Sequence, residues 1–208
     1  MIDWNVTTIL CIIITLISIV GFSKPDIIAN FSHYPYKEKR ANQFYRMLSS
    51  GFLHANWIHL LINIYVLWSF GNMVESLFVQ ILGEMKGSVM FLLLFIGGMI
   101  FADLPTYAKH KDNPSYSSIG ASGAVSSIVF ALILFSPLSM FGIYGVIPVP
   151  AILFGVIYLV YSSWASKNQE DHVDHDAHFY GALFGILFTA LFIPQILKNF
   201  VDQLLAIF

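Results

Sequence analysis

Long uninterrupted runs of apolar residues dominate this chain, and they restrict its fold more than any other feature. Residues 9–22 form one such run, and others recur along the chain with polar segments between them. Hydrophobic residues make up 57% of the chain and charged residues only 11%, whereas a soluble domain carries about 25% charged residues. The apolar residues gather in blocks and do not alternate, which favours transmembrane helices over a barrel. We therefore predict an all-α, polytopic membrane protein.

The apolar runs divide into six predicted spans within a single domain of residues 1–208. No basic leader precedes the first run, since Asp3 is the only charged residue there, so we expect this run to be retained as a helix. The predicted spans are residues 6–22, 57–78, 88–104, 120–137, 143–164 and 177–197. Pro148 and Pro150 are expected to kink the start of the fifth span. The connection 23–52 is long and rich in aromatic residues, which predicts a folded segment at the membrane interface.

Composition also excludes several classes of site. The only cysteine, Cys11, lies within the first apolar run, so neither a disulfide framework nor a thiolate metal site is available. A net charge of −2 gives no indication of nucleic-acid binding. The partner that the sequence itself implies is the lipid bilayer, and we expect no cofactor.

The second predicted span contains polar residues that are expensive to place in a bilayer. His59 and Asn63 are four residues apart and share one helix face, and His54 lies five residues before His59. Their N–H groups could stabilise an oxyanion in a dry site. Alternatively, they could join helices by hydrogen bonds worth roughly 0.6 kcal/mol each. The residues themselves leave both interpretations open.

Ser122 stands at the predicted start of the fourth span, between small residues that include Gly120 and Gly123. Such a serine could mark a tight helix entry, where small residues let backbones approach closely. It could also be a nucleophile, because the unsatisfied N–H groups of a first helical turn can stabilise a developing negative charge.

His178 stands at the entry of the sixth predicted span and is followed by Gly181 and Gly185. Two glycines at this spacing form a face that permits close helix packing, and the small residues around Ser122 offer a matching surface. If the two spans pack there, His178 comes near Ser122. A neutral imidazole is the usual base that activates a serine hydroxyl.

The same region offers a competing interpretation as a metal site. Three histidines are spaced three residues apart and alternate with three aspartates: His172, His175, His178, Asp171, Asp174 and Asp176. Such a set could bind a transition metal, so a metal or ion transporter is one alternative. However, aspartates before a helix more often cap it, and we find no internal repeat of the kind transporters show. We assign no metal site. Asp176 is two residues from His178 and is not expected to face it.

Taken together, these residues resemble the rhomboid family of intramembrane serine proteases. The resemblance runs from Tyr45 to about Gly185. Tyr45-Arg46 looks like the family's Trp-Arg loop motif, and Gly71 to Glu75 looks like its Gly-x-x-x-Glu motif. The remaining matches are the His-and-Asn pattern of His54, His59 and Asn63, the Gly-x-Ser-Gly motif of Gly120, Ser122 and Gly123, and Ala177-His178 with Gly181 and Gly185.

The resemblance implies a minimal six-helix bundle in the cell membrane, with Ser122 and His178 as a catalytic dyad that has no acidic third member. His59, Asn63 and the Ser122 backbone N–H would form the oxyanion hole. Arg46, Glu75, His54 and the four glycines would support the site. The implied substrates are transmembrane proteins, cut in or near their membrane span. The family also implies an alternative function, a non-catalytic rhomboid-like protein that binds membrane clients.

Two positions depart from the family pattern. Tyr45 replaces the usual tryptophan and keeps an aromatic side chain at the interface. Ser126 stands one turn after Ser122, where some relatives carry an aromatic ring that stacks on the catalytic histidine. The missing ring is expected to loosen the base.

Overall fold

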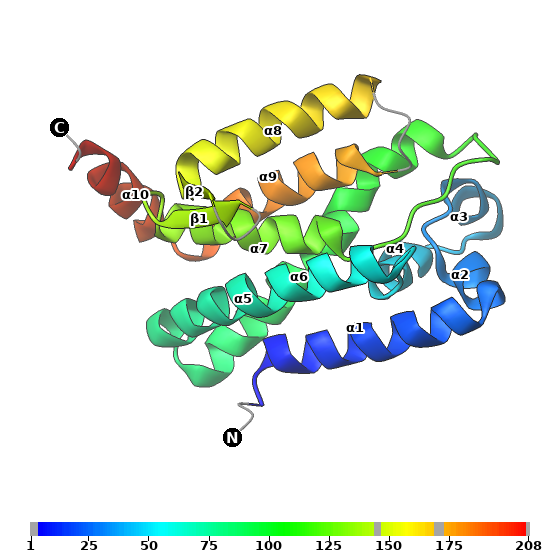
Figure 1. The fold of residues 1–208 in the computed structure, drawn as a ribbon, viewed down its shortest axis with the longest axis horizontal. Helices are drawn as coiled ribbons and strands as arrows, with labels where there is room; N and C mark the ends of the chain where they lie inside the picture. Colours follow the sequence, from blue (N-terminus) through cyan, green and yellow to red (C-terminus); the bar gives the residue numbers. More distant parts are fainter. Residues whose placement is uncertain (1–3, 144–146, 169–172, 207–208) are drawn as a thin grey trace.

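The computed structural model describes residues 4–143, 147–168 and 173–206. Helices account for most of the described chain (Figure 1). The long helices are α1 (Val6–Ser23), α5 (Trp57–Leu82), α6 (Glu84–His110), α7 (Ser122–Phe135), α8 (Ala151–Asn168) and α9 (His175–Phe192), with α10 (Gln195–Leu205) at the end. Between α1 and α5 lie α2 (Pro25–Phe31), α3 (Pro35–Ala41), α4 (Arg46–Ser49) and the short 3-10 helix η1 (Ser50–Phe52). The 23–52 connection therefore consists largely of short helices.

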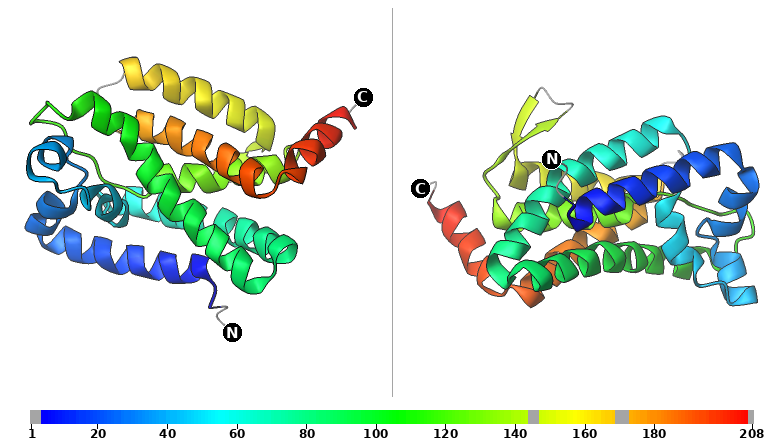
Figure 2. Two further views of the ribbon diagram at one scale, coloured as in Figure 1. Left: turned by 180° about the vertical axis from the view of Figure 1, so that it is seen from behind. Right: turned by 90° about the horizontal axis from the view of Figure 1, so that it is seen from below.

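Helix α7 forms the centre of the bundle, with α5, α6, α8 and α9 packed around it (Figures 1 and 2). Residues 123–134 of α7 are all buried. Its sequence is apolar or small on every side, as expected for a helix that faces no solvent. Because α6 ends at His110 and α7 begins at Ser122, this serine lies where the polar loop 111–121 meets α7.

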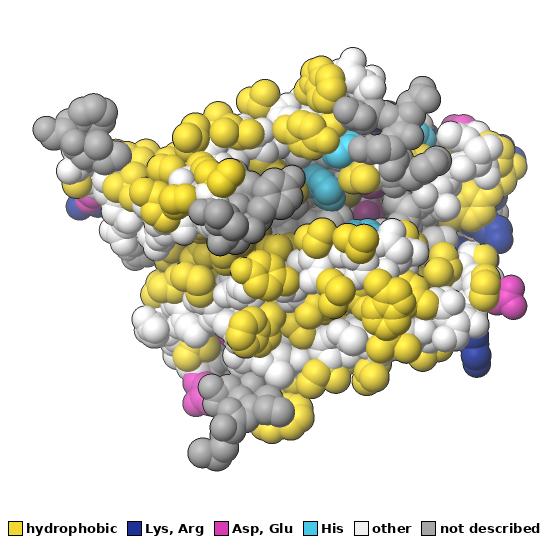
Figure 3. Space-filling view, viewed as in Figure 1, with side chains coloured by type: hydrophobic (Ala, Val, Ile, Leu, Met, Phe, Trp, Pro, Cys, Tyr) yellow, Lys and Arg dark blue, Asp and Glu magenta, His cyan; other side chains and the backbone are white. Residues whose placement is uncertain are grey.

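Three helices, α1, α5 and α6, are long and apolar enough to cross a membrane, and α9 with α10 adds a fourth if this bent pair is one span. Their outward faces carry exposed large apolar side chains, including Leu16, Leu61 and Trp68. Figure 3 shows hydrophobic side chains over much of one face, with lysine and arginine side chains mainly at its right-hand edge. These surfaces suit contact with lipid.

The segment before α8 differs from the prediction. Residues 140–143 and 147–150 form a two-stranded antiparallel sheet, β1 (Met140–Ile143) and β2 (Ile147–Pro150). The helix therefore begins at Ala151, eight residues after the predicted start at Ile143. Each residue before a proline is driven toward an extended conformation, so Pro148 and Pro150 keep Ile147 and Val149 out of a helix. The chain is mostly helical, and this hairpin is the part of the fifth predicted span that is not helical.

The last predicted span also ends earlier than expected. Helix α9 stops at Phe192, and α10 runs at 110° to it. Pro194 explains the break, because Ile193 before it leaves the helical conformation, with φ −132° and ψ 70°, and Pro194 donates no N–H. The predicted span 177–197 therefore contains a sharp turn.

Candidate active site

The closest packing in the bundle brings Ser122 and His178 to the same region. A Cβ atom built on Gly181 would overlap the backbone of Gly123, and one built on Gly185 would overlap the backbone of Ser127. A Cβ atom on Gly123 would lie 3.5 Å from the carbonyl oxygen of Ala177. The residue after Ser122 thus lies against the residue before His178, at the N-terminal ends of α7 and α9.

His59 of α5 approaches the same loop from another side. A Cβ atom on Gly120 would lie 2.6 Å from Cε1 and 2.8 Å from Nε2 of His59, so the imidazole covers the backbone two residues before Ser122. Gly120 has φ +137°, a conformation that other residues rarely adopt. Asn63 is buried, and its amide donates to the carbonyl oxygen of His59 at 2.9 Å. In Figure 3, histidine side chains appear near the middle of the face, between the hydrophobic side chains that surround them.

His54 connects α1 to the Ser122 loop through its two ring nitrogens. The backbone N–H of Ala121 donates to Nε2 at 3.5 Å, while Nδ1 lies 2.9 Å from Ser18 Oγ. Because Nε2 accepts, Nδ1 carries the proton and donates to Ser18, whose hydroxyl donates to the Phe52 carbonyl at 3.0 Å. Burial, helped by nearby His59, lowers the pKa of His54 to about 3, so the ring stays neutral in this chain of bonds.

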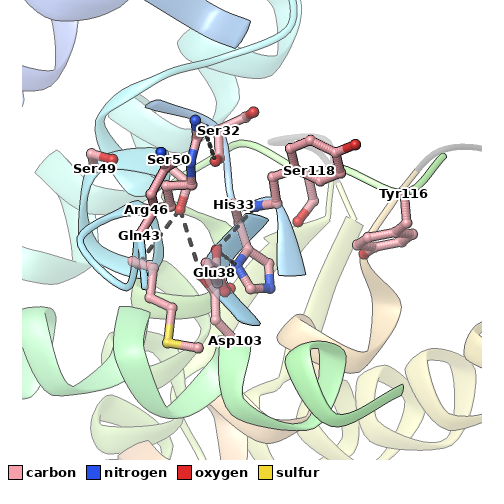
Figure 4. Close-up of polar contacts among 12 residues, drawn as sticks. Ser32, His33, Glu38, Gln43, Arg46, Ser49, Ser50, Asp103, Tyr116 and Ser118 are labelled. Atoms are coloured by element: carbon pink, nitrogen blue, oxygen red, sulfur yellow. Dashed lines mark hydrogen bonds and ion pairs between the residues drawn. The ribbon is translucent and has the colours of Figure 1, made fainter. Parts of the chain in front are cut away.

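Arg46 is buried in the 25–52 segment and binds its backbone. Its guanidinium donates to the carbonyl oxygens of Ala29 and Ser32 at 3.1 Å each, and its Nε donates to Gln43 at 2.8 Å (Figure 4). These bonds hold α2 and α4 together. This environment fits the structural role that the resemblance implies for Arg46.

A buried acidic cluster that the sequence did not predict fixes the loop leading to Ser122. His33 and Ser118 exchange two backbone hydrogen bonds of 3.0 Å, and His33 Nδ1 lies 2.8 Å from Glu38 and 3.7 Å from Asp103 (Figure 4). Burial opposes protonation of His33, but the hydrogen bond to Glu38 and the neighbouring carboxylates outweigh it and raise its pKa. No spacing pattern marked these residues, because they come from separate elements.

Asp174, at the N-cap of α9, and Asp176, in its first turn, bind groups on neighbouring elements. Asp174 caps α9 by accepting from the Ala177 N–H at 2.9 Å, and it also accepts from Thr106 and Tyr116. One oxygen of Asp176 pairs with Lys109 at 2.9 Å, and the other accepts from Ser166. Both side chains therefore tie α9 to its neighbours.

Within residues 4–143, 147–168 and 173–206, no group of three or more His, Cys, Asp or Glu side chains is placed to hold a metal ion. His175 and His178 make an edge-on ring contact with centroids 5.8 Å apart. His172 and Asp171, which completed the alternative metal set, lie outside the described residues.

A small cavity of about 20 Å³ lies beside Ser122, enough for one water molecule. Its lining includes Ser50, Asp103, Ser118 and Asp174. Polar groups thus extend from the surface loops to the first turn of α7.

At the opposite end of α5, Glu75 caps helix α1. Its two oxygens accept from the backbone N–H groups of Val6 and Thr7 at 2.9 and 2.8 Å, and from the Thr7 hydroxyl at 2.7 Å. Gly71, one turn earlier, allows this approach, because a Cβ there would lie 2.9 Å from the Thr7 side chain. The Gly-x-x-x-Glu pattern therefore joins α1 to α5.

We expect the Glu75→Gln variant to be less stable by roughly 1–3 kcal/mol, the usual range for hydrogen bonds to a charged group. The glutamine amide keeps one acceptor oxygen, but its NH2 group replaces the other oxygen and cannot accept from the backbone N–H groups of α1. Thermal unfolding in detergent measures the loss. Glu84→Gln is the matched control, because Glu84 is exposed at the start of α6, and an equal loss there would contradict the capping role.

The fold and the site define a multi-pass helical membrane protein with a partly buried cluster of histidine, serine and asparagine side chains. A family model described as "Rhomboid domain" matches residues 41–195, and the chain belongs to the rhomboid family. The resemblance seen in the motifs is confirmed. The chain is accordingly a multi-pass integral membrane protein.

Individual relatives are similar to this chain at modest identity. It is 29% identical over 156 residues to presenilin-associated rhomboid-like protein A, mitochondrial, of Danio rerio, covering 67% of this chain and 35% of the relative. The human presenilin-associated rhomboid-like protein, mitochondrial, is 29% identical over 169 residues, 74% of this chain and 39% of its own length. Rhomboid protease GlpG of Haemophilus influenzae is 28% identical over 125 residues, 60% of this chain and 57% of the relative. The chain thus spans well under two thirds of these proteins.

Proposed function

We propose that this protein is an intramembrane serine endopeptidase that cleaves transmembrane proteins in or near their membrane span. Ser122 attacks the scissile carbonyl, and His178 removes the hydroxyl proton and returns it to the leaving amine. Water then releases the acyl group from Ser122. The relative from Haemophilus influenzae is named as a rhomboid protease, which is consistent with this proposal.

The observation that carries the proposal is the backbone contact between Gly123 and Gly181, with Gly123 also against Ala177. Gly123 follows Ser122 directly in sequence, Ala177 directly precedes His178, and Gly181 lies one helical turn after Ala177. Two helices that meet without intervening side chains hold the first turns of α7 and α9 at a fixed separation. This packing supports the proposal that His178 removes the proton of the Ser122 hydroxyl.

His59, Asn63 and the Ser122 backbone N–H are proposed to stabilise the tetrahedral oxyanion. The imidazole of His59 against Gly120 supports this role, because it lies next to the turn that carries Ser122. Asn63 uses one amide N–H for the His59 carbonyl and keeps the other for the oxyanion.

We further propose that all six long helices, α1 and α5 to α9, cross the membrane as one rhomboid domain. Helix α7 has 14 residues and is about 21 Å long at 1.5 Å per residue, shorter than the hydrocarbon core of about 30 Å. A buried helix of this length leaves room for a water-filled approach to Ser122. The polar cavity beside Ser122 fits such an approach.

Covalent labelling tests the proposal directly. The purified protein in detergent is treated with a fluorophosphonate or an isocoumarin, and the adduct is located by mass spectrometry. We expect one adduct, on Ser122, in the native protein, and strongly reduced labelling in His178→Ala. A folded native protein that stays unlabelled would instead favour a client-binding, non-catalytic role.

A further inference from the structure

The aromatic ring of Tyr158, on α8, stacks on the imidazole of His178. The two rings are nearly parallel, with an interplanar angle of 25° and centroids 6.1 Å apart. This separation lies within the range of about 4.5–7 Å in which aromatic rings interact. The Tyr158 hydroxyl lies 2.6 Å from Ser126 Oγ. Ser126 is one helical turn after Ser122, so Tyr158 contacts both the helix of the nucleophile and the base.

Neighbouring rings restrict how Tyr158 can move. Phe154, one turn earlier on α8, stacks against it with centroids 5.8 Å apart, and Phe130 of α7 lies 5.7 Å away. Phe154 in turn contacts Phe141 of β1, which stacks on Phe70 of α5 at 4.8 Å. A continuous row of aromatic contacts thus runs from α5 through the hairpin to Tyr158 and His178.

We propose that Tyr158 is a positioning residue for the base His178, fixed in place by its hydrogen bond to Ser126. The proposal rests on the assignment of His178 as the base. Stacking on the Tyr158 ring restricts the orientation of the His178 imidazole. The hydrogen bond to Ser126 fixes the position of the Tyr158 ring relative to α7. Helix α8 thereby contributes to the reaction through the base.

The chemistry of the step explains why an aromatic face is useful here. His178 becomes an imidazolium when it takes the Ser122 proton, and it loses that charge when the proton passes to the leaving amine. The face of an aromatic ring attracts a nearby cation, and the attraction grows when water is excluded. Tyr158 therefore favours the charged intermediate state over the resting state, which raises kcat and leaves substrate binding unchanged.

The experiment compares kcat and KM for cleavage of a single-span test protein in liposomes. We expect Tyr158→Leu to lower kcat about tenfold with KM changed less than twofold. Tyr158→Phe keeps the ring and should recover most of this loss. The loss of kcat that remains in Tyr158→Phe should equal the loss in Ser126→Ala. The double variant Tyr158→Phe/Ser126→Ala should be no slower than either single variant, because both changes remove the same hydrogen bond.

Trp164→Leu is the matched control, since it removes an aromatic ring from the same helix, where Trp164 packs on Tyr161 with centroids 6.2 Å apart. Equal losses of kcat in Trp164→Leu and Tyr158→Leu would overturn the proposal, because the effect would then be one of general packing. If Tyr158→Leu does not fold, Tyr158→Phe and Ser126→Ala decide, and native kcat in both would overturn it. Absence of native cleavage and of Ser122 labelling would instead refute the proposed function.

Discussion

Replacement of Ser122 by alanine is expected to reduce cleavage of a single-span test protein by at least about 10³-fold, to the rate of liposomes without enzyme. The expected loss is large because the nucleophile and its base act as one unit, and removal of either one removes the covalent route. The measurement uses purified protein and substrate in the same liposomes, with product followed by gel electrophoresis over time. Cleavage at the native rate would exclude Ser122 as the nucleophile.

Ser127→Ala serves as the matched control, because Ser127 lies in the same helix and its hydroxyl donates to the Ala124 carbonyl at 2.7 Å. This variant should fold and retain near-native cleavage. His178→Ala should lose as much activity as Ser122→Ala, and the double variant no more than either one. Additive losses would show that the two residues act in separate steps.

Gly181→Ala is expected to lower cleavage about 100-fold in a protein that still folds. The added Cβ meets the backbone of Gly123, which has no flexible end that can move aside. The two helices must separate there, and a displacement of about 1 Å between reacting groups can cost about 100-fold in rate. Cleavage kinetics and thermal unfolding are measured on the same preparation. We expect a stability loss of about 1–3 kcal/mol from the overpacking.

Two further glycines separate displacement of the site from simple destabilisation. Gly155→Ala makes the same change on α8, but its Cβ would meet the movable end of Ile133 at 3.0 Å, so activity should stay near native. Gly185→Ala clashes with the Ser127 backbone one turn further from Ser122 and should cost stability with a smaller loss of activity. Equal activity in Gly181→Ala and Gly155→Ala would contradict the importance of the Gly123 contact.

The features that depend on local spacing could be predicted from the sequence. Gly181 and Gly185 are one helical turn apart, so they had to share a face, and that face packs on the small residues after Ser122 as predicted. His59 and Asn63 were likewise placed on one face of α5 by their four-residue separation. The catalytic roles of these residues stay predictions until the labelling and cleavage experiments are done.

The features that depend on how separate elements meet could not be predicted. Apolar residues around Pro148 and Pro150 gave a helix-like hydropathy signal, although proline geometry selects strands there. Nothing in the order of residues indicated that the side chain of His33 would contact those of Glu38 and Asp103 next to the loop that leads to Ser122. Likewise, the ring expected to be missing at Ser126 is replaced by Tyr158 from α8, because contact across helices depends on their rotation.

The burial of α7 on every side has a consequence for the synthesis of this protein. Its first turn contacts Gly181 of α9, which is synthesised 59 residues after Ser122. A growing chain that ends before α9 has the proposed nucleophile but neither its base nor the surface that holds the helix in place. Such a chain cannot cleave membrane proteins around it during insertion. Proteolytic activity is therefore expected to begin only when the final helices have been inserted, so completion of the fold controls its onset.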